Sequence, residues 1–202
     1  MHATLCDILA DLVQNAVEAG ASQVDVEVAS LPGLVSVCVR DNGKGMDAET
    51  LRKAVSPFYS EAGKHDHRKV GLGLPLLIQT AEAAGGKADI TSEPGKGTEV
   101  RFTMDAGSWD IPPMGDLPET VVGLMTLGGG GYDLRLSRRT ARGEYEVSRR
   151  ELVEALGNLE EAGTLVLAKA FLESQEAEIG QAGAAGVPGG FNGSSGKEAE
   201  DG

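Results

Sequence analysis

The first residues whose types could do chemistry lie in the segment DLVQNAVE, where an amide and carboxylates interrupt an apolar pattern. Asp11, Asn15 and Glu18 are four and three residues apart, so a helix would project them from one side, at the margin of its apolar face. Amide and carboxylate oxygens are hard donors that Mg²⁺ accepts while it bridges to phosphate. The alternative is a solvated polar stripe that continues through Asp7 and Gln14.

Two glycine-punctuated segments follow, DNGKGM at 41–46 and GLGL at 71–74. The first comes directly after an alternating segment that predicts a strand, and the second opens an apolar segment that predicts a helix. Glycine lets backbone N–H groups meet a phosphate at a helix N-terminus, although each glycine alone is also typical of a plain turn. A Walker A loop is absent, because no Gly-Lys is followed by Ser or Thr, and GLGL lacks the Rossmann spacing.

The elements that must position these residues are a helix, two strands, a second helix and a hairpin. Apolar residues at helical spacing predict the first helix, which Gly20 stops. QVDVEVASL and GLVSVCVRD alternate apolar with polar residues and predict two paired strands. KADITSE and TEVRFTMD, joined by PGKG, predict a hairpin with Val100, Phe102 and Met104 on one side. This pattern predicts an α/β domain that ends near Asp105.

In this order, the segments resemble the ATP-binding domain of the gyrase, heat-shock chaperone, histidine kinase and MutL superfamily, the GHKL or Bergerat-fold ATPases. Asn15 matches the family's N-box, DNGKGM its G1 box, GLGL its G2 box, and GKGT at 95–98 its closing Gly-Thr. The match covers about residues 4 to 104, and the G2 box is most similar to that of histidine kinases. The resemblance implies the α/β (α+β) class, as a two-layer sandwich with helices on one side of a mixed sheet.

The resemblance also implies an adenine pocket at the end of the second strand. Asp41 would accept the adenine amino hydrogen, a requirement that apolar walls cannot meet. Gly43 and Gly45 would let the backbone approach the base, since they carry no Cβ. Thr98 would support the adenine contact through its hydroxyl.

The same resemblance implies ATP and Mg²⁺ as cofactors. Asn15 would ligate a Mg²⁺ ion that bridges to the triphosphate. The backbone of the G2 box would meet phosphate, which assigns nucleotide binding to Gly71, Leu72, Gly73 and Leu74. Lys69 stands where histidine kinases of this type have a glycine, and it either reaches a phosphate or is solvated.

Asp11 is the candidate catalytic residue. In hydrolysing members of the superfamily, a Glu one helical turn before the N-box Asn orients or deprotonates the attacking water. Asp is shorter by about 1.5 Å of reach, and a general base must come within about 3 Å of its proton, so we expect slow turnover. Only fourteen residues precede Asn15. We therefore expect no dimerisation domain with a phosphoacceptor His and no self-contained histidine kinase activity.

Composition argues against some partners. The chain has 18 Lys and Arg residues and 31 Asp and Glu residues, which gives a net charge of -13. The field of this charge repels nucleic acid and anionic membranes unless a local basic patch overrides it.

No apolar run approaches the roughly 18 residues of a membrane span, and the N-terminus lacks a signal peptide pattern. Cys6 and Cys38 lack metal-binding spacing. We expect a cytoplasmic protein that binds neither nucleic acid nor membrane.

The remaining chain carries no further motif. We expect the ATP-binding domain over 1–106, a linker over 107–118, a small C-terminal α/β unit over 119–178, and a disordered Gly/Ala/Ser-rich tail over 179–202. Residues 56–70 are charged and aperiodic, which predicts a lid that is mobile without nucleotide.

The C-terminal unit also concentrates positive charge, in Arg135, Arg138, Arg139, Arg142, Arg149 and Arg150. These arginines could bind an acidic protein partner, dock onto the chain's own acidic face, or remain solvated at a hairpin edge. Two function classes stay open: an ATPase or nucleotide-dependent regulator of a partner protein, and a kinase of histidine or serine (anti-sigma) type that phosphorylates a separate partner. The layout also resembles ATP-binding proteins linked to hydrogenase and ferredoxin complexes.

Overall fold

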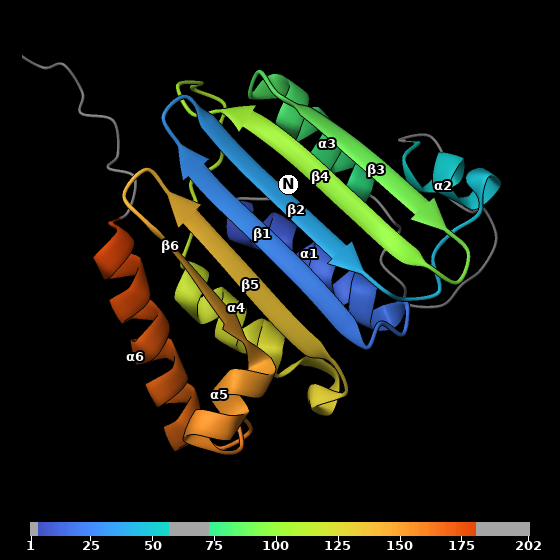
Figure 1. Cartoon of the computed structure of the whole chain (residues 1–202). Coiled ribbons are helices and arrows are strands. Elements are labelled where there is room, and N and C mark those ends of the chain that lie inside the picture. Colours follow the sequence, from blue (N-terminus) through green and yellow to red (C-terminus); the bar gives the residue numbers. More distant parts are fainter. Residues whose placement is uncertain (1–3, 57–72, 181–202) are drawn as a thin grey trace, which may run out of the picture.

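The structure is a computed structural model that describes residues 4–56 and 73–180 (Figure 1). Three of the predicted site residues, Lys69, Gly71 and Leu72, lie outside the described residues. The same holds for the predicted lid beyond Ser56 and for the predicted tail from residue 181.

Six strands form one mixed sheet in the order β3-β4-β2-β1-β5-β6. Their bounds are β1 Gln23–Leu31, β2 Leu34–Asp41, β3 Lys87–Glu93, β4 Gly97–Asp105, β5 Asp133–Thr140 and β6 Glu144–Ser148. Every neighbouring pair is antiparallel except β1 and β5, which run parallel. The predicted strand pair and the predicted hairpin are therefore both present, as β1–β2 and β3–β4.

The helices cover one face of this sheet. Their bounds are α1 Leu5–Glu18, α2 Ala48–Ala54, α3 Gly73–Ala83, α4 Leu117–Met125, α5 Arg149–Leu156 and α6 Ala162–Ile179, with a 3₁₀ turn at Leu127–Gly130. Figure 1 shows α1, α3 and α4 behind the sheet, α6 beside β6, and α2 beyond β3 at the sheet's edge. The predicted α/β sandwich with helices on one side of a mixed sheet is confirmed.

The core follows from the patterns of the sequence. Thr4 and Asp7 form a capping box that starts α1, and the apolar residues of this helix face the sheet. Val100, Phe102 and Met104 are buried on the helix-facing side of β4, as the period-2 pattern predicts. The alternate residues of β4 face the other way, so the sheet has one apolar and one polar face.

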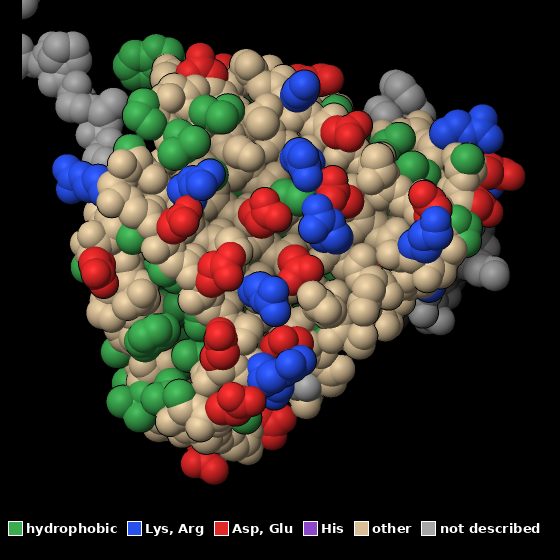
Figure 2. Space-filling view, viewed as in Figure 1, with side chains coloured by type: hydrophobic (Ala, Val, Ile, Leu, Met, Phe, Trp, Pro, Cys, Tyr) green, Lys and Arg blue, Asp and Glu red, His purple; other side chains and the backbone are tan. Residues whose placement is uncertain are grey.

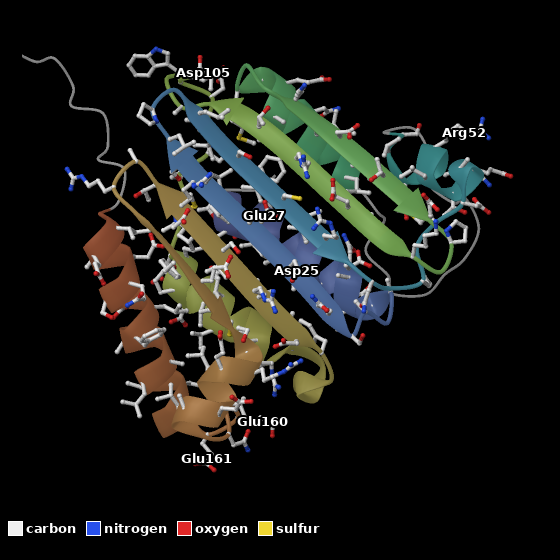
Figure 3. All side chains as sticks on the ribbon, in the orientation of Figure 1. Asp25, Glu27, Arg52, Asp105, Glu160 and Glu161 are labelled. Atoms are coloured by element: carbon white, nitrogen blue, oxygen red, sulfur yellow. The ribbon has the colours of Figure 1, made fainter. Side chains whose placement is uncertain are left out.

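None of the described helices covers the polar face of the sheet. Acidic and basic side chains are interspersed across it (Figure 2), and Figure 3 shows Asp25 and Glu27 on the strand β1. Across the strands, Asp25 lies opposite Arg40, and Arg40 Nε donates to Glu99 Oε2 at 2.8 Å. Opposite charges on neighbouring strands support the pairing and keep this face solvated.

The elements after residue 116 extend the first sheet rather than build one of their own. Strand β5 pairs with β1 over eight residues, from Gln23↔Asp133 to Ser30↔Thr140. The segment between β4 and α4 is also attached, since the N–H groups of Leu5 and Cys6 donate to the carbonyls of Pro113 (2.8 Å) and Met114 (3.0 Å). One hydrophobic core runs from α1 to α6. The boundary near residue 107 does not separate two cores.

Candidate nucleotide-binding site

Three polar side chains lie abreast on the helix-facing side of neighbouring strands. Asp41 ends β2, Thr98 begins β4 and Ser92 nears the end of β3. Thr98 pairs with Ser92, and Arg40 pairs with Glu99, which sets Asp41 beside Thr98. All three are half-buried and line a cavity of about 590 Å³, whose lining also includes Arg40 and Glu99 of the opposite face and does not include Asn15. The structure thus brings the two predicted adenine contacts, Asp41 and Thr98, together.

Asp41 is held by its own turn. Its Oδ1 accepts from the backbone N of Gly43 at 2.7 Å. The next residue, Asn42, accepts through Oδ1 from the backbone N of Ser22 (2.9 Å) and of Gln23 (3.0 Å). The bonds of Asn42 tie the DNGKGM turn to the connection between α1 and β1, and the bond to Gly43 orients the carboxylate of Asp41, which lines the cavity.

The glycines of this turn and of the hairpin are required by close backbone packing. Gly45 has φ +62°, and a Cβ there would lie 1.9 Å from the carbonyl oxygen of Glu93. Gly97 has φ +97°, and a Cβ there would lie 1.9 Å from the carbonyl oxygen of Asp41. The DNGKGM turn and the β3–β4 hairpin are therefore interlocked, an arrangement that only glycine permits. The predicted approach of Gly43 and Gly45 to a base stays a prediction.

The N-box residues lie on the exposed side of α1. Asp11 and Asn15 are both exposed, and within the described residues the Asn15 side chain makes no hydrogen bond. Glu18 instead accepts from Gln14 Nε2 at 3.1 Å, as a solvated stripe would. Gly73 lies close to Asp11: a Cβ atom added to Gly73 would be 3.9 Å from Oδ2 of Asp11.

The described part of helix α3 runs from Gly73 to Ala83 and includes the second half of the GLGL segment. Leu74 packs against the hydrophobic core and Pro75 is buried in the first turn, where proline costs no hydrogen bond. The first described turn of α3 itself holds no acidic side chain, but the carboxylate of Asp11 lies beside Gly73. An anion at this end of α3 would therefore need a cation that offsets the charge of Asp11.

Asp47 directly follows the DNGKGM turn and caps the next helix, α2. Its Oδ1 accepts from the backbone N of Thr50 at 2.7 Å and so caps α2. This hydrogen bond to the ionised form lowers the pKa of the Asp47 carboxyl. The fully exposed carboxylate is a structural cap and lies outside the lining of the cavity.

Sequence reasoning missed Ser92. Its Oγ lies 2.9 Å from Thr98 Oγ1 and 2.8 Å from the backbone N of Met46, so it joins the hairpin to the DNGKGM turn. The signal was present in TSEPGKGT, because a hairpin closed at PGKG places Ser92 opposite Thr98. A hydroxyl paired with a candidate base-contacting hydroxyl is a candidate of the same site.

Comparisons with known proteins identify the family of this chain. The model of the family described as histidine kinase-, DNA gyrase B-, and HSP90-like ATPase matches residues 2–108. This is more than half of the 202 residues. The chain belongs to this family and carries an ATP-binding domain of the histidine-kinase-like type.

Two of the relatives are much longer than this chain. A putative sensor protein of Shewanella frigidimarina is 33% identical over 111 residues, which are 52% of this chain and 16% of the relative. The sensor histidine kinase ZraS of Klebsiella oxytoca is 39% identical over 103 residues, 50% of this chain and 21% of the relative. The chain thus spans about a fifth or less of these relatives.

Among solved structures, the N-terminal domain of a DNA repair protein superposes with a TM-score of 0.47 at 16% identity, over 80% of this chain and 58% of that one.

In the described part of the chain, no helix is both long and apolar enough to cross a membrane.

Proposed function

We propose that the chain binds Mg·ATP and acts as a slow ATPase or nucleotide-dependent regulator of a separate protein in the cytoplasm. One observation carries the proposal: Asp41 and Thr98, the predicted base contacts, share the helix-facing side of the sheet, and Gly73 of α3 lies beside Asp11. The strand ends would offer acceptors to a base, and a cation that offsets the charge of Asp11 would let the start of α3 favour an anion.

The described residues fit the implied metal and nucleotide. Asn15 offers an exposed amide oxygen, which is a hard donor suited to Mg²⁺. When bound, Mg²⁺ would supply positive charge to the phosphate oxygens. Asp41 would accept from the base, and Asp11 would take a proton from water near Gly73. Lys69, Gly71 and Leu72 stay assigned to the phosphates by resemblance alone.

The alternative is transfer of the γ-phosphate to a separate protein. Relatives named as histidine kinases support it, and the matches cover 21% and 20% of two of them. In this reaction a His or Ser of the partner would attack the γ-phosphorus while the bond to the β–γ bridging oxygen breaks and ADP leaves. A hydrogenase or ferredoxin-linked complex is the proposed setting of that partner.

The proposed docking region for an acidic partner is the C-terminal region. Arg135, Arg139, Arg142 and Arg150 are exposed and support it. Arg138 does not belong to that surface, because it is buried against Glu176. The docking surface proposed here is therefore smaller than the six-arginine cluster.

The experiment compares nucleotide affinity and turnover of the full chain with those of two α1 variants. Asp11→Ala should reduce ATP turnover about tenfold or more while the affinity for Mg·ATP survives, because Asp11 would act only on the attacking water. Asn15→Ala should weaken Mg·ATP binding, because it removes a metal ligand. Gln14→Ala, an exposed neighbour on α1, is the matched control and should change neither quantity.

Two results would count against the proposal. If the wild-type chain binds no Mg·ATP in calorimetric titration, the nucleotide site is wrong. If it hydrolyses ATP rapidly and Asp11→Ala has no effect, Asp11 belongs only to the solvated stripe. Turnover that appears only after a phosphoaccepting partner is added would favour the kinase alternative.

A further inference from the structure

The Ser92 hydroxyl has three hydrogen-bond neighbours. Its Oγ lies 2.8 Å from the backbone N of Met46, 3.0 Å from the carbonyl oxygen of Gly97 and 2.9 Å from Thr98 Oγ1. These groups come from the DNGKGM turn and from the first two residues of β4. A single half-buried side chain therefore links the two segments that build the base pocket.

The directions of these hydrogen bonds follow from the number of hydrogens available. A hydroxyl donates once and accepts through two lone pairs. The N–H of Met46 can only donate to Ser92, and the carbonyl of Gly97 can only accept from it. Because the hydrogen of Ser92 is used by Gly97, the hydrogen between Ser92 and Thr98 must come from Thr98.

Thr98 is thereby fixed as an acceptor toward the cavity. Its only hydroxyl hydrogen points to Ser92, so only lone pairs remain for a ligand. Asp41 is also an acceptor, since an ionised carboxylate has no hydrogen to donate. The two polar side chains that stand beside each other at the pocket both require a donor from the base.

We propose that Ser92 is a positioning residue that sets base selectivity by holding Thr98 as an acceptor, so that the pocket selects a purine with an amino group at position 6 over one with a keto oxygen. This inference rests on the proposed nucleotide site. An amino group donates to Asp41 and Thr98, whereas a keto oxygen would face two acceptors. Leaving half-buried acceptors unpaired is costly, which gives the selectivity its physical basis.

The first test needs no variant. Calorimetric affinities of the wild-type chain should be higher for ATP than for purine riboside triphosphate and for inosine triphosphate. Purine riboside lacks the 6-amino donor, and inosine places a 6-keto acceptor against lone pairs while its N1–H is a donor that purine riboside lacks. If either analogue binds as tightly as ATP or more tightly, the assignment of Asp41 and Thr98 as acceptors for a 6-amino group is wrong.

The second test changes Ser92. In Ser92→Ala the Thr98 hydroxyl can rotate and donate to a keto oxygen, so the ratio of ATP to inosine triphosphate affinity should fall about tenfold, the equivalent of one hydrogen bond. Loosening of the turn would weaken both nucleotides alike and leave the ratio unchanged. Ser36→Ala, a half-buried serine on the opposite face of β2, is the matched control and should keep the wild-type ratio.

A double-mutant cycle assigns the effect to Thr98. Thr98→Val removes the hydroxyl, so adding Ser92→Ala to it should leave the affinity ratio unchanged. An equal loss for both nucleotides in Ser92→Ala would make Ser92 a purely structural residue and overturn the inference while the proposed function stands. Failure of the wild-type chain to bind any of the three nucleotides would overturn both.

Discussion

At the scale of single residues, Asp41 carries two separable tasks. Its Oδ1 accepts from the N–H of Gly43, which shapes the turn, and in the proposed function its other oxygen would accept from the base. Asparagine can do the first task through its amide oxygen but would present an amide donor in place of the second acceptor. The substitution Asp41→Asn therefore tests recognition with the turn retained.

We expect Asp41→Asn to lower ATP affinity about tenfold or more, because an amino group of the base would meet another donor. Calorimetric titration measures this loss. The thermal unfolding midpoint of the variant should stay close to that of the wild type. Unchanged affinity in a folded variant would show that Asp41 does not contact the base.

Residue spacing predicted the placement of Asp41, Thr98 and Gly73, because strand alternation and glycine-led helices are local patterns. The reason for Gly45 and Gly97 could not be read from the sequence. Both are required by the carbonyl of a residue more than forty positions away in the chain, which only the folded backbone brings within reach. Ser92 was missed for the same kind of reason, since its bonds cross from one segment to another.

At the scale of elements, the interlocked turn and hairpin predict a strong dependence on Gly97. Its φ of +97° and the 1.9 Å approach of a Cβ to the carbonyl of Asp41 leave no room for a side chain. Gly97→Ala should destabilise the chain by about 3 kcal/mol or more through backbone strain and displacement of β2.

The matched control is Gly95→Ala in the same hairpin. Gly95 has φ +75°, but no atom lies within 4 Å of its Cβ position, so only the strain of about 1 kcal/mol applies. Urea unfolding of the two variants measures the difference. Equal losses of stability would mean that the close contact with Asp41 is relieved at no cost.

The elements themselves were largely predictable, but one partnership was not. Alternation and helical spacing predicted the strands and helices on both sides of residue 107. The parallel pairing of β1 with β5 joins residues that are about a hundred positions apart, and no local pattern specifies it. The Pro- and Gly-bearing segment 107–118 looked like a linker, although its carbonyls accept from the first turn of α1.

At the scale of the whole molecule, one ion pair fastens α6 to the sheet. Arg138 Nε donates to Glu176 Oε1 at 3.1 Å, and the two side chains are 3% and 8% exposed. Arg138 also donates to Ser30 Oγ at 3.0 Å, and the hydroxyl of Tyr145 donates to Glu176 at 2.8 Å. The pair therefore connects α6, β5, β6 and β1.

Removing one member should be costly. Glu176→Ala leaves the charge of Arg138 buried without its partner, and we expect a loss of about 3–5 kcal/mol in the free energy of unfolding. The double variant Arg138→Met/Glu176→Leu should recover most of it, because apolar groups then fill the space. Arg139 and Glu144 form the matched exposed pair, and Glu144→Ala should cost less than about 1 kcal/mol. If urea unfolding shows that Glu176→Ala and Glu144→Ala lose the same free energy of unfolding, this account is wrong.

The shared sheet also predicts how the chain responds to division near residue 107. A chain of residues 1–106 would lack β5, so the backbone edge of β1 would be unpaired, and the common hydrophobic core would lose the buried residues of α4, β5, β6 and α6. The first turn of α1 would also lose the carbonyls of Pro113 and Met114. We expect the short chain to unfold at lower urea concentration than the full chain or to self-associate, as light scattering after size exclusion would show. A chain of residues 1–180, which keeps every described element, is the control and should match the full chain in both measurements. If the short chain is instead monomeric, equally stable and binds ATP as tightly, then the C-terminal elements are an appendage, and the common core contributes nothing to the nucleotide site.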